Sequence, residues 1–300
     1  MIRILITGGS GFLGKPLIGL LVQEGYEILS IARSKGDIPK GKGKLVHHRA
    51  DLTDPGSFVE QIRNFAPEIL IHLAWQGIPD FSAAQCSSNL KMSVDLAETV
   101  ISAGACKKIL VSGSCFEYNQ MFGPCMESPR GTVKDSFTWA KHTLLSWLEM
   151  ACAQRGICLG WLRAFYIYGP GQRVGSLVPS IFNALKTGQL PPLRTPNNSN
   201  DFIHVQDVAR GFVQAVKRDF PSGIFNLGSG VSTPVARVCE IAEKLVTGGH
   251  TLTDELVRAT QGNQKTCDFW ANYSRAEEFL NWKAEFKLED GMRGYLETVS

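Results

Sequence analysis

Short apolar segments alternate with helix-like patterns through the first half of the chain. The segment Ile2–Thr7 is a predicted strand, and Phe12–Glu24 follows it with four leucines on one helical face before Gly25. Asp54 and Pro55 have the character of an N-cap and a first-turn proline, which predicts that another helix begins there. Such alternation predicts an α/β fold with a doubly wound parallel sheet and helices on both faces. Further strands are predicted at Glu27–Ala32, Leu45–Ala50, Glu68–Ala74, Lys108–Ser112 and Cys158–Phe165, and helices at Asp54–Phe65, Ser82–Ala103 and Asp135–Arg155.

The pattern becomes less regular after Tyr168, where glycine and proline pairs interrupt it. Helices are still predicted at Val178–Lys186, Gln206–Lys217 and Pro234–Leu245. We therefore expect a first domain over residues 1–168, with a return segment near 201–220. Residues 169–300 would mostly form a smaller C-terminal α/β domain over the carboxyl edge of the sheet, where ligands bind in open α/β folds.

Composition narrows the class of protein. The 300 residues include 31 Lys and Arg against 28 Asp and Glu, and this net charge of +3 argues against nucleic acid as a partner. No signal peptide or membrane-spanning segment is visible, so we expect no membrane partner. None of the eight cysteines forms a C-x-x-C pair, and no His/Cys/carboxylate cluster indicates a metal. We expect reduced thiols and a cytoplasmic location.

The first strand ends in a glycine-rich turn, in which Gly8, Gly11 and Gly14 have the spacing G-x-x-G-x-x-G. Glycines there allow a tight turn, close approach of a pyrophosphate and close packing of the helix on the strand. The helix N-terminus supplies free N–H groups for the negative charge. A structural turn is the alternative, but the strand–turn–helix context favours a Rossmann-type dinucleotide-binding domain. The expected cofactor contacts are Gly8, Ser10, Gly11, Phe12, Leu13 and Gly14.

The end of the second predicted strand indicates which dinucleotide is bound. A carboxylate at this point would bind the ribose 2′-hydroxyl of NAD, but the chain has Arg33 and Ser34. Arginine pairs with a 2′-phosphate, and serine can donate a hydrogen bond to it. The sequence therefore favours NADP (NADPH), unless Arg33 is only a solvated loop cation.

Further motifs occur in the order found in one family. Taken with the glycine turn, they cover nearly the whole chain, which resembles the extended short-chain dehydrogenase/reductase family of nucleotide-sugar epimerases, dehydratases and ketoreductases. The resemblance implies that Asp51, Leu52, Leu73, Ala74, Trp75, Asn89 and Ser112 border the cofactor. The motifs that carry it are Asp51-Leu52, Leu73-Ala74-Trp75, Asn89, Ser112–Tyr118, Arg163–Gln172, Asp201–Ala209, Phe225–Gly230 and Leu280-Asn281-Trp282.

The family's catalytic residues are present with one exception. Ser114 matches the catalytic serine, and Lys141 matches the lysine of the family's Y-x-x-x-K motif, which also contacts the cofactor. The family's tyrosine is replaced by Phe137, which can neither donate nor accept a proton. Phe137 could be an engineered Tyr→Phe change that inactivates an enzyme. Alternatively, another residue supplies the proton, with Tyr166, Cys115, Glu117 and Tyr118 as candidates, or the protein is a non-catalytic NADP-binding sensor.

The residues around Ser114 bear on the reaction. Family dehydratases have Asp-Glu directly after the catalytic hydroxyl, whereas this chain has Cys115-Phe116. The NAD-binding carboxylate typical of the epimerases is absent too. The resemblance thus favours an NADP(H)-dependent reductase of a nucleotide-linked 4-keto-6-deoxy sugar in deoxysugar biosynthesis, with a 4-epimerase as the alternative.

A nucleotide-diphosphate sugar would be the substrate. Asn200 stands where the family often has a diphosphate-binding arginine, a role that Arg173, Arg194 or Arg258 could assume. The expected substrate contacts are Trp75, Ser114, Cys115, Tyr166, Val178 and Asn200.

The resemblance also implies a homodimer. In the family, the helices that carry Asn89 and Lys141 pair with their copies in a four-helix bundle. Trp147 and Leu144, Leu145 and Leu148 would supply the apolar surface, unless the leucines only face the sheet.

Overall fold

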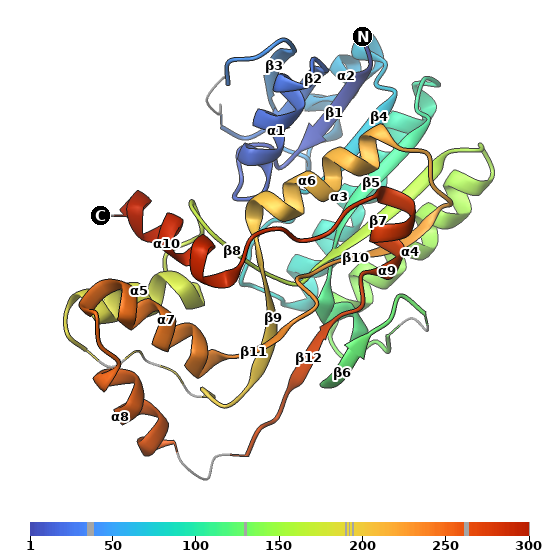
Figure 1. Ribbon diagram of the computed structural model, residues 1–300. Coiled ribbons are helices and arrows are strands. Elements are labelled where there is room, and N and C mark those ends of the chain that lie inside the picture. Colours follow the sequence, from blue (N-terminus) through green and yellow to red (C-terminus); the bar gives the residue numbers. More distant parts are fainter. Residues whose placement is uncertain are drawn as a thin grey trace.

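A seven-stranded parallel sheet forms the centre of the molecule, with strand order β10-β7-β5-β4-β1-β2-β3 (Figure 1). The structure is a computed structural model that describes residues 1–34, 39–128, 131–189, 191, 193, 195–260 and 264–299. The predicted doubly wound α/β fold is confirmed. The strands are β1 (Arg3–Thr7), β2 (Glu27–Ala32), β3 (Lys44–Arg49), β4 (Ile69–His72), β5 (Lys108–Ser114), β7 (Cys158–Ala164) and β10 (Gly223–Leu227).

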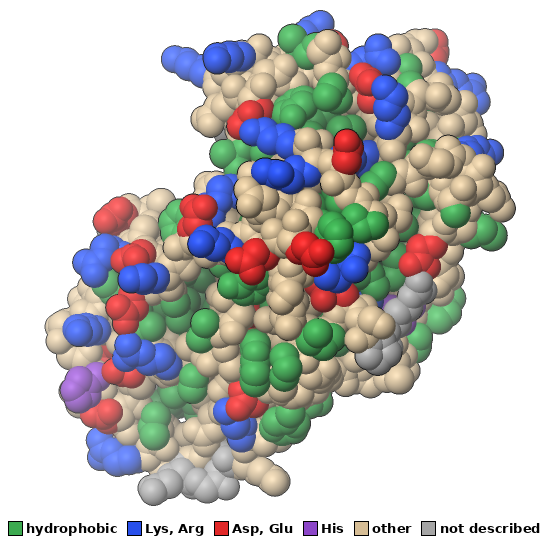
Figure 2. All heavy atoms as spheres, turned by 45° about the vertical axis from the view of Figure 1, so that its right-hand side comes forward, with side chains coloured by type: hydrophobic (Ala, Val, Ile, Leu, Met, Phe, Trp, Pro, Cys, Tyr) green, Lys and Arg blue, Asp and Glu red, His purple; other side chains and the backbone are tan. Residues whose placement is uncertain are grey.

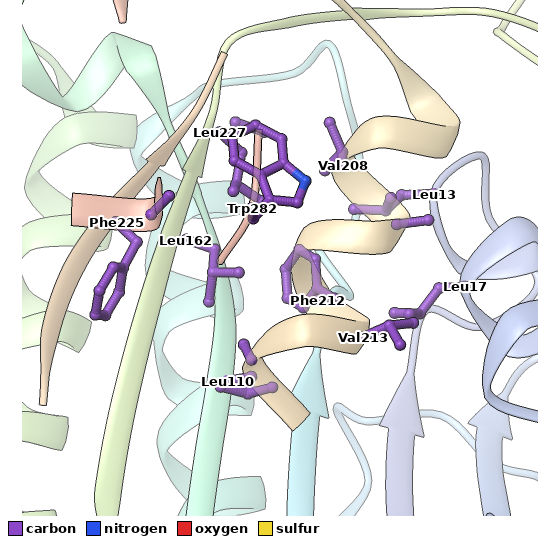
Figure 3. Close-up of a cluster of buried hydrophobic side chains, with 14 of the residues drawn as sticks. Leu13, Leu17, Leu110, Leu162, Val208, Phe212, Val213, Phe225, Leu227 and Trp282 are labelled. Carbon is purple, nitrogen blue, oxygen red and sulfur yellow. The ribbon is translucent and has the colours of Figure 1, made fainter. Parts of the chain in front are cut away.

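Helices cover both faces of this sheet. One buried cluster joins the sheet to α1 (Gly14–Gln23), α6 (Val205–Lys217) and α9 (Ser274–Leu280). Figure 3 shows this cluster, in which Leu17 of α1 and Phe212 of α6 meet among strand residues such as Leu162. A second cluster joins the opposite face to α2 (Val59–Phe65), α3 (Ala83–Ser102) and α4 (Ser136–Ala153). Burial on both faces explains why the inner strands are largely apolar, whereas the edge strand β3 is partly exposed and carries several basic and histidine side chains.

A smaller second sheet lies beyond the carboxyl edge of the first (Figure 1). Its order is β11-β9-β12-β6, and β8 pairs with β9. A third apolar cluster packs four helices around it. The strands are β6 (Phe122–Cys125), β8 (Tyr166–Tyr168), β9 (Ser199–His204), β11 (Ser232–Pro234) and β12 (Asp268–Ala271), and the helices are α5 (Leu177–Lys186), α7 (Val235–Thr247), α8 (Thr251–Ala259) and α10 (Leu288–Val299).

The expected division at residue 168 does not separate the two sheets, because segments on each side of it contribute strands to both. β6 lies within residues 1–168 but pairs with β12 of the second sheet. β10 follows the expected return segment near 201–220 and forms an edge of the first sheet next to β7. Each crossing brings a loop to the carboxyl edge of the main sheet.

Two predicted helices begin later than expected. α1 begins at Gly14 rather than Phe12, because the glycine turn extends to Leu13. The predicted helix from Asp54 is a 3-10 turn, η1 (Pro55–Ser57), followed by α2. The Asp54 side chain accepts a hydrogen bond from Gly56 N at 3.1 Å, as the expected N-cap would.

The surface that was expected to form a dimer is largely buried within the chain. Leu144, Leu145 and Leu148 are at most 1% exposed and pack against the sheet, so they cannot supply an intermolecular face. Trp147 is partly buried in the same cluster. The homodimer therefore stays a prediction without support from these leucines.

The outer surface shows mixed charge. On the face in Figure 2, basic and acidic side chains are interspersed rather than gathered by sign. Within the described residues, no helix is long and apolar enough to cross a membrane.

Candidate active site

The glycine turn after β1 is shaped by contacts that only glycine tolerates. A Cβ atom on Gly14 would lie 2.2 Å from Gly8 O, and one on Gly8 would lie 2.9 Å from Ala74 N. Gly8 also has a positive φ of 74°. α1 begins directly after the turn with no side-chain cap and no acidic residue in its first turn. Lys15 N already donates to Gly11 O at 3.1 Å and Pro16 has no N–H, so the N–H groups at the entry to the helix, up to Gly14, are the ones available to an anion.

A cavity of about 340 Å³ opens beside this turn at the carboxyl ends of β1 to β4. Many of the residues predicted from the sequence to contact the cofactor line this cavity. The adjoining loop residues Gln76, Gly77 and Ile78 were missed, although they directly follow the recognised Leu73-Ala74-Trp75 motif. The predicted residues in the lining are Gly8, Ser10, Gly11, Arg33, Leu52, Leu73, Ala74 and Trp75; the additional ones are Ile31, Ala32, Ala50, Gln76, Gly77 and Ile78.

Asn89 and Asp51 hold the wall of the cavity rather than line it. Asn89 Oδ1 accepts a hydrogen bond from Gln76 N at 2.7 Å, and its Nδ2 donates to Gln76 O at 2.9 Å. The Gln76 side chain donates to Asp51 Oδ1 at 3.3 Å. Hydrogen bonds from Thr53 lower the pKa of Asp51, which keeps its carboxylate an acceptor. These contacts position the loop after β4.

Other predicted cofactor residues lie outside the cavity lining. The Leu13 side chain is in the buried cluster between α1 and α6 (Figure 3), and the partly buried Phe12 packs against that cluster. This leaves their backbone N–H groups as the available contacts. Gly14 is enclosed by the turn, and Ser34 is exposed beside Arg33.

Lys141 is buried at the junction of α4, β5 and the loop after β4. Its Nζ donates a hydrogen bond to Ser112 O at 2.9 Å and lies 4.1 Å from the centroid of the Trp75 ring. Burial lowers the pKa of Lys141 to about 8. Lys141 therefore contacts both Ser112 and Trp75, two other residues predicted to border the cofactor.

Phe137 lies one turn before Lys141 and belongs to an aromatic group. Its ring centroid is 5.4 Å from that of Trp75 and 5.0 Å from that of Phe81. Lys141 Nζ is 5.9 Å from the Phe137 centroid. The position of the family's tyrosine is thus beside the lysine and beside the cavity wall, but it carries no hydroxyl.

Ser114 ends β5, where the 3-10 turn η2 (Cys115–Tyr118) begins. Its Oγ accepts a hydrogen bond from Phe116 N at 3.2 Å. This bond uses a lone pair and leaves the hydroxyl proton to be donated elsewhere.

The four candidate substitutes for the missing tyrosine differ in burial and in hydrogen bonding. Glu117 is fully buried and paired with Arg163, and the Tyr118 hydroxyl donates to Asn226 Oδ1 at 2.6 Å. Burial raises the pKa of Cys115, which is only 4% exposed. Tyr166 is partly exposed, and burial raises the pKa of its hydroxyl. Of the four, Tyr166 alone keeps part of its side chain accessible.

The remaining predicted substrate residues are dispersed over the second sheet. Val178 is 1% exposed and packs in the third apolar cluster, so its side chain does not face the cavity. Asn200 is 6% exposed, and its Oδ1 accepts a weak hydrogen bond from Cys267 Sγ at 3.6 Å. The Tyr166 ring packs against Phe116, Phe202 and Phe269.

One of the three candidate arginines reaches the cavity wall. Arg173 Nη1 donates to Ile78 O at 3.3 Å, which links the loop after β8 to the loop after β4. Arg258 is in α8, far along the second sheet, and Arg194 lies outside the described residues.

His72 at the end of β4 makes the stability of this region pH-dependent. The ring bonds Thr7 Oγ1 at 2.7 Å and Ser93 Oγ at 2.9 Å, and burial and the charge of Lys141 lower its pKa to about 3. An unfolded histidine titrates near 6.5, so the stabilisation is complete above that pH and is lost as the pH falls toward 3. We expect His72 to account for a loss of about 2 kcal/mol in unfolding free energy between pH 7 and pH 5.

Urea unfolding of the unmodified chain and of His72→Gln at both pH values measures this loss. The variant should lack this part of the pH dependence, because glutamine does not titrate. Equal pH dependence in the two proteins would contradict the prediction.

No group of three or more His, Cys, Asp and Glu side chains that could hold a metal occurs in the described part of the chain. The site combines the glycine turn, a cavity wall with apolar and polar residues, the Ser114 hydroxyl and the buried Lys141.

Comparisons with known proteins show what the chain is similar to in sequence and fold. The chain is 23% identical to the probable dTDP-glucose 4,6-dehydratase of Sinorhizobium fredii (strain NBRC 101917 / NGR234), over 98% of this chain and 92% of the relative. It is 21% identical to the dTDP-4-dehydro-6-deoxyglucose reductase of Escherichia coli, over 99% and 97% of the two chains. The crystal structure of UDP-glucose 4-epimerase with UDP-glucose from Thermotoga maritima superposes with a TM-score of 0.83 at 21% identity, covering 99% of this chain and 98% of that one.

A family model matches three quarters of the sequence. Its description is NAD dependent epimerase/dehydratase family, and it spans residues 4–228, from β1 to the end of β10. This range includes the glycine turn, Ser114 and Lys141. The chain belongs to the NAD dependent epimerase/dehydratase family.

Proposed function

We propose that this chain is an NADP(H)-dependent reductase of a nucleotide-linked 4-keto-6-deoxy sugar. The observation that carries the proposal is the position of Arg33, which lines the cavity at the end of β2. The described lining of that cavity contains no carboxylate to bind the 2′-hydroxyl of NAD. NADPH is the common reductant of biosynthesis, and a reductase must exchange its cofactor at every turnover.

The residues present fit a dinucleotide phosphate. The backbone packs closely around Gly8 and Gly14, and Gly11 lines the cavity, so a pyrophosphate would lie against Gly11 and the start of α1. Arg33 and Ser34 are exposed and would hold the 2′-phosphate. The Trp75 indole N–H is buried without a partner among the described residues, so it offers a ligand one more donor.

The chain's own residues would organise a ketone for reduction. When bound, NADPH supplies the hydride. Ser114 would donate its hydroxyl proton in a hydrogen bond to the ketone oxygen, and Lys141 would keep positive charge beside that oxygen. Phe137 cannot deliver the proton that completes the alcohol, so Tyr166 or solvent must do so, and we expect slow turnover.

The test is to follow NADPH oxidation with a panel of nucleotide-linked 4-keto-6-deoxy sugars. Stoichiometric oxidation with one sugar supports the reductase. Sugar interconversion without net NADPH oxidation would replace it with the epimerase. The second candidate function is a non-catalytic NADP-binding sensor, because Phe137 lacks the tyrosine hydroxyl. Tight NADPH binding without turnover, both in this chain and in its Phe137→Tyr variant, would favour the sensor.

Arg33 should decide the coenzyme preference. In Arg33→Ala, we expect the Kd for NADPH to rise about 10- to 100-fold while the Kd for NADH stays the same, because a charge-assisted bond to phosphate contributes about 1.5–3 kcal/mol. Fluorescence titration with both coenzymes measures the ratio.

Arg49→Ala is the matched control for this experiment. Arg49 is exposed at the end of the neighbouring strand β3 and is not part of the cavity lining, so its loss should leave both affinities unchanged. Equal weakening of NADPH and NADH in Arg33→Ala would contradict the assignment of Arg33 to the 2′-phosphate.

A further inference from the structure

Glu117 is a buried carboxylate that the proposed reaction does not use directly. None of its side chain is exposed. Its Oε1 accepts a hydrogen bond from Ser114 N at 2.7 Å, and its Oε2 accepts bonds from Trp161 Nε1 at 2.8 Å and Arg163 Nε at 2.9 Å. One carboxylate therefore connects the end of β5 with two neighbouring side chains of β7.

Ser114 and Glu117 close the 3-10 turn η2 with two side-chain hydrogen bonds to the backbone. The Ser114 side chain accepts a bond from Phe116 N, while the Glu117 side chain accepts one from Ser114 N, as in a capping box. The first bond constrains the side-chain rotamer of Ser114, and the second fixes its backbone. Glu117 thus holds the backbone from which the Ser114 side chain extends.

The Trp161 indole lies between the Glu117 carboxylate and the ammonium group of Lys141 and connects the two. Lys141 Nζ is 5.8 Å from the centroid of the Trp161 ring, whose N–H donates to the Glu117 carboxylate. That bond polarises the indole and strengthens its attraction for a nearby cation. A Cβ atom on Gly113 would lie 2.4 Å from Trp161 Nε1, so the glycine between the two serines lets the indole reach Glu117.

Three groups from different elements act on the charge of Lys141 in the described part of the chain. These are Glu117 from η2, Cys86 from α3 and His72 from β4. Burial raises the pKa of Cys86, and burial lowers the pKa of His72 to about 3, so both are neutral near pH 7. Glu117, paired with Arg163, is then the negative group that favours the ammonium form of Lys141.

We propose that Glu117 is a positioning residue that holds Ser114 and Lys141 in one arrangement, directly through the Ser114 backbone and indirectly through the Trp161 indole. The roles of Ser114 and Lys141 rest on the proposed function. The arrangement itself does not depend on which reaction the site performs. Glu117 is not among the described residues that line the cavity, so the role that we propose for it is exerted through Ser114 and Lys141.

The test follows the side-chain titration of Lys141 by NMR in the full chain, with Lys141→Arg used to assign the signal. We expect the midpoint to fall by about one pH unit in Glu117→Gln, because an opposite charge nearby favours the ammonium form. A midpoint unchanged in Glu117→Gln would overturn the proposal, since a purely structural role would lower stability without moving it. No substrate or coenzyme is needed, so a failed reductase assay does not affect the result.

Glu127→Gln is the matched control. Glu127 is a second buried carboxylate near Arg163, and it accepts a bond from Asn226 N at 3.1 Å but none from Ser114 or Trp161. Its loss should leave the Lys141 midpoint unchanged; an equal fall in both variants would also overturn the specific role of Glu117.

A second variant serves if Glu117→Gln does not fold, because that change leaves the buried Arg163 without its counter-ion. Trp161→Phe removes the indole N–H together with part of a fully buried ring, but it keeps both charges. We expect a smaller fall of the midpoint in the same direction. No change in Trp161→Phe would overturn the link between Glu117 and Lys141.

Discussion

Replacing Phe137 by tyrosine should raise the rate of NADPH-dependent ketone reduction by about 10²- to 10⁴-fold, the usual contribution of a positioned general acid. The new hydroxyl would extend from a ring whose centroid is 5.9 Å from Lys141 Nζ. A cation at this range lowers the pKa of a tyrosine from its ordinary value near 10 and so brings it closer to neutral pH. The rate of NADPH oxidation at saturating substrate, followed optically for both chains, measures the gain.

Two further variants show whether the gain comes from the hydroxyl and the lysine together. Phe137→Leu keeps an apolar side chain in the aromatic group and should give no gain. Phe137→Tyr combined with Lys141→Met should lose most of it, because the tyrosine pKa would return toward 10. If Phe137→Tyr is no faster than the unmodified chain, another residue supplies the proton. Tyr166→Phe should then abolish the activity, because Tyr166 is the accessible candidate.

Removing the carboxylate of Asp201 should cost about 4 kcal/mol or more of unfolding free energy. Asp201 is fully buried in β9 and accepts hydrogen bonds from Ser229 N, Ser229 Oγ, Gly230 N and Ala271 N at 2.6–3.0 Å. Asp201→Ala leaves three backbone N–H groups without their acceptor, and each unsatisfied buried donor costs about 1–3 kcal/mol. Urea unfolding at neutral pH measures the loss.

Asp268→Ala is the control for this prediction, because Asp268 lies on β12 of the same sheet. Its side chain is 33% exposed, pairs with Lys265 at 2.6 Å and accepts a hydrogen bond from Ser232 Oγ. An exposed ion pair contributes at most about 1 kcal/mol and a side-chain hydrogen bond about 1 kcal/mol, so we expect a loss of about 2 kcal/mol or less. Equal losses in the two variants would mean that water replaces the Asp201 bonds and that this carboxylate does not hold the second sheet together.

The second sheet was the part of the fold that local pattern predicted least well. β6, β11 and β12 have only three or four residues, and all four strands, β9 included, contain charged, polar or proline residues that weaken the strand signal. They are held by long-range bonds such as that from Ala271 N to Asp201, 70 positions earlier in the chain. The residue pattern of a short segment cannot indicate a hydrogen-bond partner that is so distant in the chain.

Local signals sufficed for the parallel sheet, the glycine turn and the family. The inner parallel strands are buried on both faces and are therefore largely apolar, and the spacing of Gly14 from Gly8 follows from a contact within a few residues, whereas the approach of Gly8 to Ala74 depends on the fold. The absence of a tyrosine hydroxyl at Phe137 is likewise a property of the sequence. These features depend on residue type and on near neighbours.

Tertiary structure decided which side chains face the cavity and which support it. Leu144, Leu145, Leu148 and Val178 have ordinary apolar patterns, and only packing showed that they belong to the core. Glu117, three residues after Ser114, was a candidate acid from the sequence, and its burial against Arg163 and Trp161 is the observation behind the positioning role that we propose for it. The orientation and burial of a side chain depend on elements distant in the chain, so these distinctions required the three-dimensional structure.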